Sequence, residues 1–343
     1  MIFIKNLRSS TKNLSLTPRK LLILFSFLLL GTGILSLFLG RYPAPGFVPI
    51  ESLRNDPLAQ SLVLNLRLPR VLTAILLGMA LSASGMVFQM IFSNPLVEPG
   101  LLGVSQGAAF GASFSILFIG NMAWAVQGSA AIFAFIGLIL SYSLAHRVRF
   151  GGWTLRLVLS GIAISALFSA GLGVLKYLAD PLSQLQEITF WLLGGLWSIT
   201  WKDLNAILAI VVIALYVLYR MRWRLNLLGL SDETAFSMGV APGREKALLL
   251  LAATAATAAV ISVSGMVSWV GLIIPHLARR ILGADSRYSL PFSMLLGGIF
   301  VLTCDTMART LFSGEIPLGI LTSFIGAAAF IGMMMTKGIR VQP

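Results

Sequence analysis

The sequence predicts an all-α membrane protein with about ten transmembrane helices, and three features of its composition support that class. Of its 343 residues, 57% are hydrophobic and 11% are charged, whereas a soluble domain carries about 25% charged residues. The mean hydropathy is +0.91. Runs without any charge, such as 21–40 and 71–97, are long enough to cross the hydrocarbon core of a bilayer. The short alternating strands of an outer-membrane barrel are not seen, so the spanning elements are helices.

The first predicted helix, 21–40, follows a basic N-terminal tail and superficially resembles a signal peptide. Its apolar run is longer than a typical signal-peptide core and no clear small-residue cleavage site follows, so we expect it to be retained. The other predicted spans are 69–92, 103–120, 124–145, 155–175, 204–219, 247–264, 267–283, 289–305 and 317–336. The span at 267–283 is short, and the aliphatic stems of Arg279 and Arg280 would extend its apolar length.

Basic residues gather on one side of this predicted topology. With the N-terminus inside the cell, 18 of the 25 Lys and Arg residues fall in cytoplasmic segments, as the positive-inside rule requires. The sequence therefore predicts a multi-pass inner-membrane protein with both termini in the cytoplasm. We expect one transmembrane domain over 1–343, with a cytoplasmic tail at 1–20 and a cytoplasmic loop at about 220–246. The net charge of +13 needs no nucleic-acid partner.

A short sequence echo links the two halves of the chain. The stretch Ser82–Val87 reads S-A-S-G-M-V, and Ser262–Val267 reads S-V-S-G-M-V. In the predicted topology the two copies lie on helices that run in opposite directions, which is the pattern of an inverted repeat in a transporter. Small-residue strings are also common in membrane helices because they allow close packing, so chance similarity stays an alternative.

Features that drive a self-contained transporter or a membrane enzyme are missing from the sequence. Its acidic residues, including Glu98, sit at helix ends or in loops, whereas ion-coupled carriers usually place a carboxylate inside the membrane. No G-x-x-x-x-G-K-[ST] stretch is present to bind ATP. His146 and His276 have no second ligand spaced nearby, and the single Cys304 forms no intrachain disulfide. We expect a transport subunit with no catalytic residue, metal or cofactor, energised by another subunit.

Three stretches of the sequence are more specific than its composition. The first is R-L-P-R at 67–70 with N-P-L-V-E-P-G-L-L-G-V at 94–104. The second is L-N-L-L-G-L-S-D-E-T-A-F-S-M-G at 225–239. The third joins G-L-I-I-P-H at 271–276, D-T-M-A-R at 305–309 and E-I-P-L-G at 315–319. In this order and spacing, from about 66 to 337, the chain resembles the FecCD family of ABC importer permeases.

The resemblance implies a type II importer fold in which two identical permeases enclose a pathway lined by the fifth and tenth helices. Two cytoplasmic ATPases would bind below, and a periplasmic binding protein would deliver the substrate from above. The family's substrates include ferric siderophores, haem, cobalamin and molybdate, and of these we expect a ferric siderophore. Two alternatives stay open here: a self-contained, ion-coupled secondary transporter, and an exporter of related fold.

The loop at about 220–246 contains a predicted helix of about two turns. Ser231 suits its N-cap, and Gly239 suits its C-terminal stop. From the residues alone it is either an interfacial helix lying on lipid or a protein contact. The resemblance implies that it couples the permease to the ATPase. The coupling residues would be Asp232, Glu233, Ala235, Phe236, Met238 and Gly239, with Ala235, Phe236 and Met238 presented outward.

Two predicted turns at the cytoplasmic face form an inner gate in the family that the chain resembles. The residues that match are Asn94, Pro95 and Leu96 in the first turn, and Thr154 and Leu155 in the second. From the sequence alone, Pro95 is equally explained as a plain helix-ending residue. Leucine at 155 departs from the small polar residue that relatives often have there.

Three arginines are predicted at the outer ends of helices, against the positive-inside trend: Arg67, Arg70 and Arg309. The residues alone permit snorkelling to lipid headgroups, or a local pair of Arg309 with Asp305 at i,i+4 spacing. The resemblance implies instead that they dock glutamates of the binding protein.

Overall fold

The computed structural model describes residues 17–42, 46–312 and 314–335. Some of the basic residues behind the predicted orientation lie outside these ranges, namely Lys5, Arg8, Lys12, Lys337 and Arg340. Within the described ranges the chain is a helical bundle with one small antiparallel hairpin of strands. In that hairpin β1 (Leu39–Gly40) pairs with β2 (Gly46–Phe47). The all-α fold class predicted from the sequence is confirmed.

Eight helices of the described chain are long and apolar enough to cross a membrane. They are α2 (Pro18–Phe38), α5 (Leu68–Ile91) with its N-terminal extension, α7 (Ala123–Arg147), α8 (Trp153–Leu178), α10 (Trp201–Leu228), α12 (Pro242–Ser264), α14 (Ser286–Thr310) and α15 (Leu318–Met335). Two shorter helices match the remaining predicted spans. The first is the apolar helix α6 (Val104–Phe114), continued by the π-helical η3 (Ser115–Ile119). The second is α13 (Val270–Leu282), which carries Arg279 and Arg280 in its last turn. Each predicted span therefore corresponds to one helix, including the short one at 267–283.

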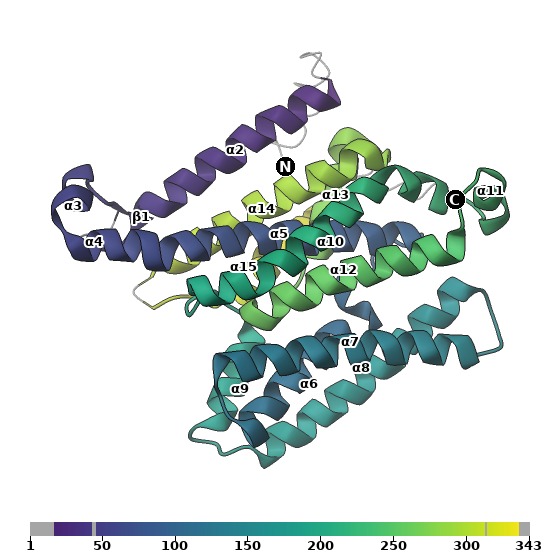
Figure 1. Ribbon diagram of the computed structural model, residues 1–343, viewed down its shortest axis with the longest axis horizontal. Coiled ribbons are helices and arrows are strands. Elements are labelled where there is room, and N and C mark those ends of the chain that lie inside the picture. The colour runs from purple at the N-terminus through teal and green to yellow at the C-terminus, as the bar shows by residue number, and fades with distance from the viewer. Residues whose placement is uncertain (1–16, 43–45, 313, 336–343) are drawn as a thin grey trace.

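The long helices run roughly along one axis, so the bundle has two ends (Figure 1). We name them the α11 end, after α11 (Asp232–Ser237), and the α9 end, after α9 (Gln184–Leu193). At the α9 end lie α3 (Ile50–Asn55), α4 (Pro57–Ser61) and the π-helical η1 (Leu62–Arg67), and α4 and η1 continue directly into α5. This continuous helix has 35 residues. At about 52 Å it is longer than the hydrocarbon core of a bilayer, so it projects beyond that core.

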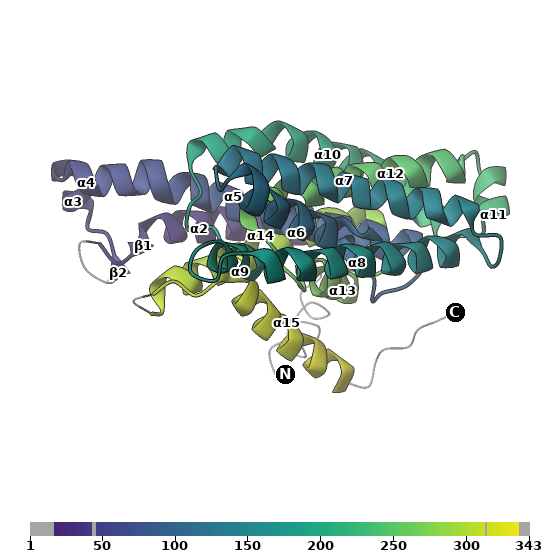
Figure 2. The same ribbon diagram turned by 90° about the horizontal axis from the view of Figure 1, so that it is seen from below.

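The central helix is α5, which packs on α10, α12, α13 and α14. Along the most apolar 18 residues of this helix, 78% of the residues are buried, whereas the figure is 28% for both α8 and α15. Figure 2 shows α15 leaning away from the bundle. Glycines make the close approach possible. A Cβ atom on Gly78 would lie 2.1 Å from the carbonyl oxygen of Gly297 in α14, and one on Gly85 would lie 1.9 Å from that of Gly271 in α13. Such backbone contacts stabilise helix pairs inside lipid.

Two stretches of irregular backbone enter the bundle. Residues 92–103 link α5 to α6 through the 3-10 turn η2 (Pro99–Leu102), and 265–269 link α12 to α13. The carbonyl oxygen of Leu102 accepts a hydrogen bond from Ser141 Oγ at 2.9 Å, about 9 Å along α7 from its last residue. A Cβ atom on Gly161 would lie 2.6 Å from the carbonyl oxygen of Leu101, about 12 Å along α8 from its first residue. Glu98 lies at the end of the loop before η2, as the sequence predicted, but this loop turns inward between α7 and α8, which the sequence did not indicate.

The two copies of the sequence echo lie on α5 and α12, which run in opposite directions along the bundle. Their backbones differ, however. Ser82–Val87 is helical throughout, whereas the second copy leaves the helix at Ser264, and Gly265 has a φ of 66°. The echo is thus not a repeat of local conformation, and the inverted repeat stays a prediction.

Candidate functional site

At the α11 end, the short helix α11 stands out from the bundle (Figure 1). Ser231 is its N-cap and accepts a hydrogen bond from the Thr234 N–H at 3.3 Å, while Gly239 follows it with a φ of 80°. Phe236 and Met238 are 72% and 55% exposed, as predicted. Ala235 was expected to be presented with them, which was wrong. It is fully buried, because adjacent helix positions point about 100° apart and its small side chain lets α11 lie against the bundle.

One ion pair holds α11 against the bundle, and a second joins the two helices beside it. Lys246 Nζ on α12 contacts Asp232 Oδ1 at 2.7 Å, so Asp232 is an internal anchor as well as a predicted partner contact. One residue earlier in α12, Glu245 pairs with Arg224 near the end of α10. Glu233 is exposed and free to contact a partner from the first turn of α11. A force on α11 therefore passes directly into α12 and, through Glu245, into α10.

The two predicted gate turns lie at the same end. In the first, Asn94 Oδ1 accepts a hydrogen bond from the Leu96 N–H at 2.9 Å, and this closed turn leaves Leu96 59% exposed. Pro95 between them is half-buried. In the second, Leu155 is 49% exposed and Thr154 half-buried. The turn η2, which follows the first gate turn, packs on α8, which begins beside the second.

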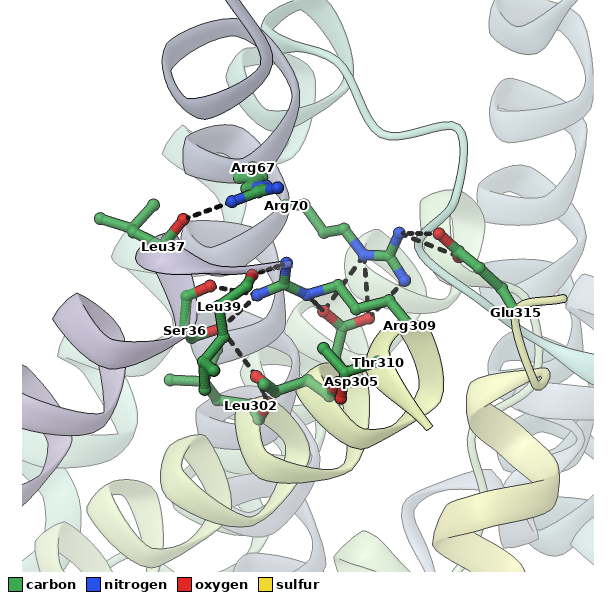
Figure 3. A network of polar contacts seen from close by, with 11 residues as sticks. Ser36, Leu37, Leu39, Arg67, Arg70, Leu302, Asp305, Arg309, Thr310 and Glu315 are labelled. Atoms are coloured by element: carbon green, nitrogen blue, oxygen red, sulfur yellow. Dashed lines mark hydrogen bonds and ion pairs between the residues drawn. The ribbon is translucent and has the colours of Figure 1, made fainter. Parts of the chain in front are cut away.

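At the α9 end, the three predicted docking arginines turn inward (Figure 3). Arg70 Nε donates to both carboxylate oxygens of Asp305, at 3.0 and 3.1 Å, and its Nη1 donates to Glu315 at 3.0 Å. Arg309 donates to the carbonyl oxygen of Leu39 at 2.7 Å. Arg67 donates to the carbonyl oxygen of Leu37 at 3.2 Å. The cluster ties α2, η1, α5, α14 and the connection before α15 to one another.

Burial in this cluster is nearly complete. The side chains of Arg70 and Arg309 are 11% and 7% exposed, and that of Asp305 is fully buried. Glu315 is the open member, with 39% of its side chain exposed. The local pair that the sequence offered, Asp305 with Arg309, spans 3.9 Å, whereas Arg70 approaches Asp305 to 2.9 Å. The stronger contact joins residues far apart in the chain, which is why sequence spacing did not reveal it.

Four residues that the sequence did not assign now have structural roles: Asp305, Glu315, Lys246 and Glu98. The first two stand inside the D-T-M-A-R and E-I-P-L-G motifs, and that was the available signal. His146 packs against Trp153, with the ring centroids 4.6 Å apart. Among the described residues, no group of three or more His, Cys, Asp or Glu is arranged to hold a metal ion.

Known proteins resemble this chain over most of its length. The pattern of the FecCD transport family matches residues 28–336. The molybdate import system permease protein MolB of Haemophilus influenzae is 37% identical over 327 residues, covering 93% of this chain and 96% of that protein. A Helicobacter pylori protein described as an iron chelatin transport system permease is 40% identical over 292 residues, covering 84% and 87%.

A solved structure also matches, and its description is an inward-facing conformation of a metal-chelate type ABC transporter. Its TM-score is 0.85 at 37% identity, covering 92% of this chain and 99% of that one. The chain is a permease subunit of an ATP-binding-cassette importer, and it belongs to the FecCD transport family.

Proposed function

We propose that two copies of this chain form the pathway of an importer that moves a metal chelate from the periplasm to the cytoplasm. The observation that carries the proposal is α11, a capped helix held by an ion pair that nevertheless exposes Phe236 and Met238. Large apolar side chains of this kind dominate the energetics of protein interfaces. In our proposal two ATPase subunits bind here.

The orientation follows from charge. Around the α11 end the described chain carries Arg147, Arg149, Arg220, Arg222 and Arg224, which would lie in or near the cytoplasm of the cell. In this arrangement both termini are cytoplasmic, the membrane is the inner membrane, and the α9 end faces the periplasm. A periplasmic binding protein would dock at the α9 end, with Arg67, Arg70 and Arg309 shaping that surface and Glu315 at its edge.

Pairing of two copies would use α8 and α15, two of the helices that the single chain leaves largely uncovered. Only 28% of the residues in the most apolar stretch of each helix are buried. Tyr177 on α8 is 89% exposed, and Phe324 on α15 is 79% exposed. In the dimer these helices would line the pathway, with Asn94, Pro95, Leu96, Thr154 and Leu155 as its inner gate. Cysteines at Leu167 and Phe324, in a chain with Cys304→Ala, are expected to form a disulfide between subunits.

The substrate class rests on the relatives, whose descriptions include an iron chelatin, a metal chelate and molybdate. A ferric siderophore is our choice among them. The direct test is uptake into liposomes that contain the permease and its ATPase, with the binding protein added outside. Radiolabelled ferric siderophore, haem, cobalamin and molybdate are compared, and ATP-dependent uptake of the ferric siderophore is expected.

The ATPase contact has a sharper test. The double variant Phe236→Asp and Met238→Asp is expected to lose ATPase co-purification, because two charges would enter an apolar contact. The matched control changes two equally exposed apolar residues at the α9 end, Phe47→Asp and Leu182→Asp. If the α11 variant still binds the ATPase, α11 is not the ATPase contact and is instead a helix that lies on lipid. Uptake by the chain alone under a proton gradient would contradict the whole proposal.

A further inference from the structure

A cavity of about 380 Å³ lies where the two irregular segments meet. Polar side chains line it from those two segments and from three helices, α6, α8 and α12: Glu98, Ser105, Gln106, Ser165, Thr257 and Ser268. Ser165 lies about 18 Å along α8 from its first residue, which places the cavity about midway between the two ends of the bundle. Leu96 of the first gate turn also lines it, so the cavity is continuous with the proposed gate.

Glu98 is the one acidic residue of this lining. Its carboxylate lies near the backbone N–H of Trp269, the residue at the N-cap position of α13. The positive end of that helix favours a negative charge at this position. Among the residues that the structure describes, no Lys, Arg or His forms an ion pair with Glu98. A carboxylate at this depth without a cation leaves acceptor capacity that a ligand can use.

A second group points to a ligand independently. Thr257 lines the cavity from α12, is fully buried, and its hydroxyl has no hydrogen-bond partner. Buried polar groups are normally satisfied, and an exception calls for a bound molecule or water. One turn earlier, Thr254 is equally buried and also unpartnered, but it does not line the cavity. It therefore serves as an internal control.

The cavity wall is rigid on the side of α13. A Cβ atom on Gly271 would lie 2.5 Å from Pro99, the neighbour of Glu98. Trp269, whose φ is 72°, holds the left-handed conformation that non-glycine residues rarely adopt. The two segments are thus pressed together and fixed, which positions the Glu98 carboxylate at the cavity rather than letting it swing away.

Resting on the function proposed above, we propose that this cavity is a substrate subsite in the pathway, where Glu98 binds a cationic or hydrogen-bond-donating group of the chelate. Ammonium, hydroxyl and amide N–H groups at the edge of a ferric chelate fit a carboxylate flanked by an amide and hydroxyls. A free oxyanion such as molybdate does not, because the carboxylate repels it. The subsite therefore selects donor-bearing chelates over oxyanions.

The test uses the full complex of permease, ATPase and binding protein in liposomes, with a ferric trihydroxamate that carries a free ammonium and with molybdate as probes. Glu98→Gln keeps an oxygen for the Trp269 N–H but removes the charge. It is expected to slow ferric trihydroxamate uptake about tenfold, as loss of a charged hydrogen bond predicts, with normal stimulation of the ATPase by the binding protein. Thr257→Val is expected to slow uptake about threefold, and Thr254→Val is expected to leave it unchanged.

Each other outcome is decisive. If Glu98→Gln transports normally while Glu98→Ala does not, Glu98 only holds Trp269 and the subsite is overturned. The subsite is also overturned if the wild-type complex takes up molybdate but not the ferric trihydroxamate. Equal slowing of uptake by Thr254→Val and Thr257→Val overturns it as well. Failure of the wild-type complex to couple ATPase activity to the binding protein contradicts instead the proposed function, and is measured separately from uptake.

Discussion

The two ends of the bundle use the same kinds of residue in opposite environments. At the α9 end, Arg70 and Asp305 form an ion pair whose side chains are 11% and 0% exposed. At the α11 end, the pair of Lys246 with Asp232 has one side chain 62% exposed. A buried charge that loses its partner keeps its full desolvation cost, whereas an exposed one is taken up by water. The α9 end is therefore fastened, and the α11 end is adjustable.

This difference suits the proposed roles of the two ends. A surface that receives a binding protein has to keep its shape, and at the α9 end ion pairs join α5, α14 and the connection before α15, while arginine hydrogen bonds add α2 and η1. A segment that follows an ATPase through its cycle has to shift and settle again, and half-exposed pairs permit that at little cost. The predictions below test whether burial, rather than the residue types, sets the behaviour of each end.

The largest effect is expected from Arg70→Ala. It would leave Asp305 buried without its main partner and lower the free energy of unfolding by about 3–5 kcal/mol. Thermal unfolding of the purified protein in detergent measures this. Arg54→Ala, an exposed arginine at the same end, is the matched control and should change stability by less than about 0.5 kcal/mol. Joint replacement by Arg70→Met and Asp305→Leu should recover most of the loss. A small effect of Arg70→Ala would mean that water reaches this cluster.

The sequence predicted the helices better than it predicted these contacts. Charge-free runs located most of the spans, because a bilayer requires about 20 apolar residues. The α11 cap was also predicted, since Ser231 and Thr234 are neighbours. The pair of Arg70 with Asp305 was not, because 235 residues separate them. Nor was the depth of Glu98, because hydropathy does not reveal that the loop after Pro95 turns inward.

At the α11 end, Asp285 should give a smaller and pH-dependent effect. Its contacts with Arg287, above all the side-chain hydrogen bond, lower the pKa of Asp285 from 3.8 to about 2. A lowered pKa contributes stability above pH 4 that is lost as the pH falls toward 2. Discounted for solvent, the contribution is about 1 kcal/mol. Unfolding of wild type and Asp285→Asn should differ at pH 6 and converge near pH 2; a constant difference would contradict this.

Removing the ion pair between Asp232 and Lys246 should change the stability of the protein very little, but it should weaken the coupling of ATP hydrolysis to transport. Asp232→Asn removes the charge that pairs with Lys246 but keeps the shape, and is expected to lower the free energy of unfolding by less than about 1 kcal/mol. The substrate transported per ATP hydrolysed should fall, since α11 would follow the ATPase less faithfully. Glu51→Gln removes the same charge from an exposed position at the α9 end and should leave that ratio unchanged. Equal effects of the two variants would show that only net charge matters.

The smallest effect tests whether the fastened end still leaves room for docking. Glu315 contacts Arg70 at 2.9 Å yet is 39% exposed and lies in the connection between α14 and α15. We expect it to occupy the position that an acidic group of the binding protein would take. Glu315→Gln should then raise the affinity for the binding protein about threefold at low salt, within the range of a partly exposed pair.

The salt dependence of the Glu315→Gln effect and a control variant test whether Glu315 competes with the binding protein for Arg70. The gain from Glu315→Gln should vanish near 1 M salt, where the Debye length falls to about 3 Å. Glu51→Gln removes an exposed charge at the same end and so changes the net charge equally, but it should leave the affinity unaltered because Glu51 is not paired with Arg70. Weaker binding by Glu315→Gln would mean that Glu315 holds Arg70 in its docking position instead of competing for it. The two outcomes differ in sign, so one titration of the binding protein separates them.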